Sequence, residues 1–108
     1  MMPPFQRVSL RELRDRFNSE ILPRIEAGEL LEVVRSSGNP NRAANQPPGT
    51  TSQRVEYFDA IEGELVLVAT VHRYLLPDGT LGASGLPDPK RIRVDGTVYA
   101  PHKPTPKG

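Results

Sequence analysis

Hydrophobic residues occupy every position from 65 to 69, within a longer stretch that runs from Glu64 to Leu76 and ends at a Pro-Asp-Gly turn sequence. A short apolar run that is rich in valine and bounded by turn residues is typical of a strand buried on both faces. The stretch becomes polar at His72, Arg73 and Tyr74. The pattern therefore predicts the central strand of a sheet, with His72 near the end of its buried part.

In the N-terminal part, apolar residues recur with the period of a helix. Ser9 and Glu12 have the spacing of a capping box, in which the serine hydroxyl accepts a hydrogen bond from the backbone N–H three residues later. Apolar residues then recur at helical spacing, and we expect them to form one core-facing stripe. Pro23 disfavours helical geometry at the residue before it, so we expect a break or kink there. The predicted stripe consists of Leu10, Leu13, Phe17 and Ile21.

The remaining apolar segments are short and separated by turn signals, which is typical of an antiparallel meander. Glu62-Gly63 and Asp95-Gly96 are two-residue hairpin turns. The predicted flanking strands cover residues 29–34, 54–61, 80–85, 90–94 and 97–100. The sequence thus predicts an α+β fold, in which an N-terminal helix packs on one face of a curved antiparallel β-sheet of about four to six strands.

Two segments lack bulky apolar residues. Residues 36–53 are rich in Gly, Pro, Asn, Ser and Thr, and they cannot bury enough surface to offset the entropy of ordering. We expect them to form a long mobile loop, and residues 101–108 to form an extended tail. Residues 1–108 are a suitable length for a single small domain.

Turn length sets strand register, so facing residues can be predicted. If Glu62-Gly63 is the loop, Phe58 faces Leu67, and a mostly apolar face results that we expect to pack under the helix. The opposite, mixed face carries His72 and Tyr74. With a three-residue loop at 77–79, His72 faces Ser84. A β-bulge would reverse these assignments. The predicted helix-facing set is Phe58, Ala60, Leu65, Leu67, Ala69 and Val71.

Composition excludes several classes of site. The chain has 14 Lys and Arg against 13 Asp and Glu, so bulk charge does not favour binding to nucleic acid, although a local basic patch is compatible with it. There is no cysteine, which excludes disulfides, thiolate zinc sites and cysteine nucleophiles. His72 and His102 lack metal-ligand spacing, and we expect no metal and no cofactor. No apolar run of signal-peptide or membrane-spanning length is present, so we expect a soluble cytoplasmic protein without membrane partners.

His72 is the candidate catalytic residue. Beside Ser84 it could act as a general base for a hydroxyl nucleophile, but no third orienting group is visible. It could also serve as acid or base in metal-independent RNA cleavage, with Arg91 and Arg93 near the phosphate. The ordinary explanation is a half-buried strand histidine. The candidate binding residues are Arg73, Tyr74, Ser84, Lys90, Arg91 and Arg93.

Three hypotheses of function follow. The leading one is a small non-enzymatic binding or accessory module that uses the mixed sheet face or an edge strand to hold a protein partner or a second copy of itself. The second is a small ribonuclease of toxin type, because a helix that precedes an antiparallel sheet is similar, in architecture alone, to small microbial ribonuclease toxins. The third is a noncatalytic nucleic-acid-binding protein that uses the same arginines.

Overall fold

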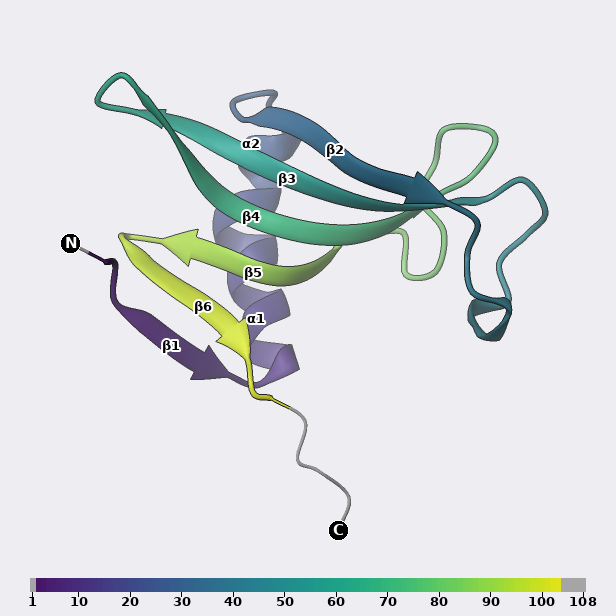
Figure 1. The fold of residues 1–108 in the computed structure, drawn as a ribbon, viewed down its shortest axis with the longest axis horizontal. Coiled ribbons are helices and arrows are strands. Elements are labelled where there is room, and N and C mark those ends of the chain that lie inside the picture. The colour runs from purple at the N-terminus through teal and green to yellow at the C-terminus, as the bar shows by residue number, and fades with distance from the viewer. Residues whose placement is uncertain (1, 104–108) are drawn as a thin grey trace, which may run out of the picture.

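The computed structural model describes residues 2–103 and consists of one helical segment packed on a six-stranded sheet (Figure 1). The sheet order is β1-β6-β5-β4-β3-β2, and every pair is antiparallel except β1 with β6. The strands are β1 (Phe5–Val8), β2 (Leu31–Gly38), β3 (Thr51–Ile61), β4 (Glu64–Leu75), β5 (Asp88–Val94) and β6 (Thr97–Pro101). The helical elements are α1 (Leu10–Arg16), the π-helical turn η1 (Phe17–Ile21), α2 (Leu22–Glu26) and the short 3-10 turn η2 (Arg42–Ala44). The predicted α+β class, with a helix on one face of a mostly antiparallel sheet, is confirmed.

The helical segment begins where the sequence predicts. The Ser9 hydroxyl accepts a hydrogen bond from the backbone N–H of Glu12 at 3.1 Å, as an N-cap residue does. Leu13 and Phe17 are fully buried, whereas Leu10 is 55% exposed and does not belong to the stripe. Pro23 falls in the first turn of α2, where its missing N–H is tolerated, and the helix is interrupted just before it by η1 rather than broken.

The hairpin of β3 and β4 follows the predicted register only from its turn to Phe58. Ile61 pairs with Glu64 and Phe58 with Leu67, but Tyr57 then pairs with Ala69, so Val68 has no partner on β3. This bulge shifts every later pair by one residue and exchanges the faces. The predicted helix face is therefore wrong for Phe58, Ala60, Leu65 and Leu67, between the turn and the bulge, and correct for Ala69 and Val71 beyond it. Ala69 and Val71 lie under the helix as expected, but Val55 and Tyr57 join them, and Leu65 and Leu67 are 61% and 37% exposed on the opposite face.

The core lies between the helical segment and the face of the sheet that this exchange creates. Leu13, Phe17 and Ile21 contribute the helical side. The sheet contributes Val55, Tyr57, Val68, Ala69, Val71 and Ile92. In Figure 1 the helices lie behind the sheet, and in the described part of the chain no helix covers the face turned toward the viewer. We call the face of the sheet that the helices cover the helix face, and the opposite, uncovered face the open face.

Three boundaries differ from the sequence prediction. β2 reaches Gly38 and β3 begins at Thr51, so both ends of the predicted loop 36–53 are paired, because backbone hydrogen bonds between strands do not need apolar side chains. The mobility of residues 39–50 stays a prediction. Pro101 closes β6 instead of starting a tail, and residues 104–108 lie outside the described residues.

Residues 80–85 do not form the predicted strand. The turn at 77–79 has the expected register, since the backbone N–H of Gly82 donates to the carbonyl of Tyr74 at 2.8 Å, and Leu75 bridges to Leu81. Pairing then stops, because Ala83 and Gly85 adopt left-handed backbone conformations with φ of 54° and 79°. His72 consequently pairs with Asp88 of β5 and not with Ser84.

Among residues 2–103, the helical elements are all too short to cross a bilayer.

Candidate functional site

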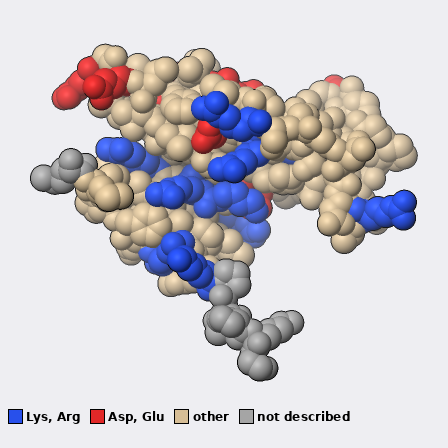
Figure 2. Space-filling model, in the orientation of Figure 1, with Lys and Arg blue, Asp and Glu red and all other residues tan. Residues whose placement is uncertain are grey.

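Arginines from four strands gather on the open face of the sheet. Register places Arg91 of β5 in one row with Thr70 of β4 and Glu56 of β3, and alternation puts Arg93 and Arg54 on the same face. Figure 2 shows the resulting band of basic side chains across the middle of this face. We call this set the arginine face. It consists of Arg7, Arg35, Arg54, Arg91 and Arg93.

Acidic side chains are scarce on the same face. Glu56 is the carboxylate at its centre, and Arg35 forms an ion pair with it. Within the described chain, Arg7, Arg54, Arg91 and Arg93 form no salt bridge with a carboxylate. Asp59 lies on the helix face, where it pairs with Arg24 at 3.0 Å. The face therefore has an excess of positive charge that the net charge of +1 conceals.

Phe5 holds two of these arginines in place. The guanidinium carbons of Arg7 and Arg91 lie 4.7 and 5.2 Å from the centre of its ring, within the range of cation–π contacts. Arg7 also donates to the carbonyl of Pro101 at 3.0 Å. Because these contacts order the guanidinium groups before any ligand arrives, less side-chain entropy is lost on binding.

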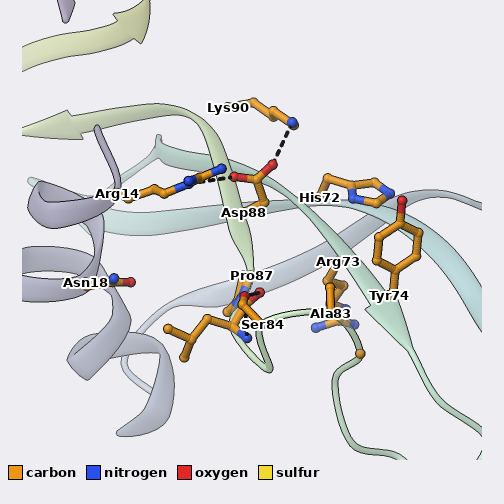
Figure 3. A pocket seen from close by; sticks show the side chains of 12 residues that line it. Arg14, Asn18, His72, Arg73, Tyr74, Ala83, Ser84, Pro87, Asp88 and Lys90 are labelled. Carbon is orange, nitrogen blue, oxygen red and sulfur yellow. Dashed lines mark hydrogen bonds and ion pairs between the residues drawn. The ribbon is translucent and has the colours of Figure 1, made fainter. Parts of the chain in front are cut away.

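A cavity of about 470 Å³ lies beside the arginine face (Figure 3). It is located at the start of β5, where the end of β4 is flanked by the loop 76–87 and no longer by β5. Its walls come from α1, η1, β4, the loop and β5. Five predicted site residues line it: His72, Arg73, Tyr74, Ser84 and Lys90. Sequence reasoning missed Arg14, Asn18, Leu86, Pro87 and Asp88, which line it too.

Asp88 joins the two sides of the cavity. Its Oδ2 accepts from the Lys90 ammonium at 2.8 Å, and its Oδ1 lies 3.5 Å from Nε of Arg14 on the helix. Figure 3 shows both cations directed at this one carboxylate. Arg73, by contrast, is engaged elsewhere, since it donates to Gln53 at 2.9 Å and to Glu32 at 3.3 Å on the helix face. Among the other two cations that line the cavity, Arg14 and Lys90, there is one in excess over Asp88, and the role of Arg73 in binding stays a prediction.

His72 does not form the predicted pair with Ser84. Its Nε2 shares a hydrogen bond with Oγ of Ser52 at 2.6 Å, and its ring makes a T-shaped contact with the ring of Tyr74, with centroids 4.6 Å apart. Ser84 instead interacts with the backbone of Leu86. Ser52 was not identified from the sequence, because the bulge at Val68 decides which β3 residues lie beside His72.

Burial and the nearby Lys90 lower the pKa of His72, although Asp88 opposes this effect. Because the pKa is lower in the folded protein than in the unfolded chain, the unfolded chain takes up the proton first as the pH falls. The stabilising contribution of His72 is thus fully present above about pH 6.5, the unfolded value, and is lost below it.

We therefore expect the free energy of unfolding, measured with urea, to decrease between about pH 7 and pH 5, and His72→Gln to flatten this slope. His102→Gln is the matched control, because His102 is exposed and its replacement leaves the surroundings of His72 intact. An unchanged slope in His72→Gln would contradict the conclusion that His72 causes this dependence on pH.

Within residues 2–103, no three His, Asp or Glu side chains are grouped so that they could hold a metal ion.

Comparison with protein-family models, with curated proteins and with solved structures gives no match for this chain. The proposal of function therefore rests on the arginine face and the cavity.

Proposed function

We propose that the protein is a non-enzymatic binding module whose ligand is nucleic acid, held by its phosphates on the arginine face. The observation that supports this most directly is the set of four arginines without carboxylate partners in the described chain, presented together on one uncovered sheet face. Guanidinium groups bind phosphate through paired, charge-assisted hydrogen bonds. The protein would thus be a binding module that acts through a sheet face, as in the first hypothesis, and its ligand would be nucleic acid, as in the third.

The spacing of the arginines suits a polyanion better than a single small anion. Arg91 and Arg93 are two residues apart on one strand, which separates them by about 7 Å. Arg7 on β1 and Arg54 on β3 lie at the two ends of a path that crosses four strand intervals, about 19 Å in total. A ligand that contacts all of them must carry several negative charges along its length, as a nucleic-acid backbone does.

The geometry favours binding without cleavage. RNA cleavage of the metal-independent kind needs both an acid and a base free to exchange protons with the substrate. His72 Nε2 is occupied by Ser52, Glu56 is paired with Arg35, and Asp88, which lies opposite His72 on the neighbouring strand, is paired with Lys90 and Arg14. We therefore place the ribonuclease hypothesis second, and the binding experiment below includes an assay for cleavage.

The proposal predicts a strong dependence of affinity on salt. Each phosphate contact releases condensed counterions, so the logarithm of the association constant falls with the logarithm of salt concentration by about 0.7 per contact on a single strand. With four arginines engaged, we expect a slope near −3, measured by fluorescence anisotropy of a labelled oligonucleotide between about 50 and 200 mM salt. Binding that is absent at the lower salt, or independent of salt, would refute the proposal.

Two further results of that experiment distinguish the alternatives. Shortening of an RNA probe in the presence of chelator, abolished by His72→Ala, would support the ribonuclease hypothesis instead. Binding to an acidic protein surface with no binding to nucleic acid would support a binding module whose partner is a protein.

A further inference from the structure

We infer that the cavity beside the arginine face receives one unstacked base of the bound strand, so that the protein selects single strands over duplexes. This inference rests on the proposed function and adds the class of nucleic acid and a base-binding site. It depends on three features of the structure: the position of the cavity next to Arg54 and Arg91, the chemistry of its walls, and the position of Asp88.

The cavity opens beside the path proposed for the phosphates. His72 lines the cavity and is also paired across the sheet with Arg54. Lys90 lines it and directly precedes Arg91. A strand whose phosphates contact Arg54 and Arg91 therefore passes the cavity, and a base that leaves the stack there has a place to enter.

The walls combine apolar surface with hydrogen-bonding side chains, and a nucleobase requires both. Tyr74, Leu86 and Pro87 provide an aromatic ring and apolar surface for the faces of a flat ring. Asn18 and Ser84 provide side chains that can both donate and accept hydrogen bonds at its edge. A volume of about 470 Å³ lies in the range of small-ligand sites. A base inside a duplex cannot reach such a site without being extruded, which penalises duplex binding.

Asp88 gives the cavity a preference among bases. Its carboxylate accepts hydrogen bonds, and Arg14 beside it donates them. Adenine and cytosine each present an amino donor next to a ring-nitrogen acceptor, which matches this pair, whereas uracil has no amino group. We therefore expect a single adenine or cytosine in an oligouridine strand to increase affinity.

The experiment compares strands that differ at one position. In labelled oligouridine strands, we expect one cytosine to bind several-fold more tightly than uracil, and one abasic position to bind about tenfold more weakly than cytosine. We expect the matching duplex to compete poorly. Equal affinity for the cytosine, uracil and abasic strands would overturn the base site and leave the arginine face intact, whereas no binding to any strand would refute the proposed function.

Asp88→Asn tests the role of the carboxylate. Because it removes a negative charge beside the phosphate path, the abasic strand should bind as tightly as before or more tightly, while the preference for cytosine over uracil should fall to less than about twofold. Glu12→Gln is the matched control, since Glu12 also pairs with an arginine but lies outside the cavity. A urea titration establishes that each variant is folded. Persistence of the cytosine preference in folded Asp88→Asn would overturn the assignment.

Discussion

Phe17→Ala should destabilise the protein by about 3–5 kcal/mol, the range for removal of a buried phenyl ring with incomplete collapse of the space it leaves. Phe17 is fully buried and belongs to the one cluster of buried residues that joins the helical segment to the sheet. Domains of this size have a total stability of about 5–15 kcal/mol, so the loss is a large part of it. The measurement is the midpoint and slope of urea unfolding followed by circular dichroism.

Leu10→Ala is the control on the same helix. Leu10 is 55% exposed, and both leucine and alanine favour helix, so we expect a change within about 0.5 kcal/mol. Similar losses in the two variants would mean that the helix packs on the sheet through a different stripe from the one described.

The double variant Arg91→Ala, Arg93→Ala should weaken binding of single-stranded nucleic acid by about a hundredfold. A hydrogen bond to a charged group contributes about 1.5 kcal/mol, or about tenfold in affinity, and two are removed. The slope of affinity against salt should also become shallower by about 1.4, because two phosphate contacts are lost.

The matched control for this variant removes two exposed arginines that do not belong to the arginine face. Arg11 lies on α1 and Arg42 in η2, so Arg11→Ala, Arg42→Ala lowers the net charge by the same amount. We expect a change of less than about threefold, which reflects long-range attraction alone. Equal losses in the two double variants would show that binding follows net charge and not the arrangement of one face.

Features encoded by neighbouring residues could be predicted from the sequence. The N-cap at Ser9 and the hairpin at Asp95-Gly96 were identified correctly, because each needs only two to four adjacent residues. β1 was missed, because four residues give little periodic signal and their partner strand lies about ninety residues away. The bulge at Val68 was also missed, since a continuous apolar run does not show which residue is extra.

The same distinction applies to the site. Alternation along one strand was enough to place Arg91 and Arg93 on a common face. Joining them to Arg7 and Arg54 requires the order of the strands, and the contact between Arg14 and Asp88 requires the packing of the helix on the sheet. The loop 76–87 turns Ser84 away from His72 through backbone conformations at Ala83 and Gly85 that the sequence alone did not indicate.

Because β1 pairs with β6, the sheet can be completed only late in the synthesis of residues 1–101. Phe5 has its partner at Val98, so a nascent chain that leaves the ribosome from its N-terminus cannot form this pair until Val98 has emerged. Arg7 and Arg91 depend on the Phe5 ring for their placement, so the surface that they share is assembled only then. A nascent chain that ends before Val98 would thus lack the ordered cluster of Phe5, Arg7 and Arg91.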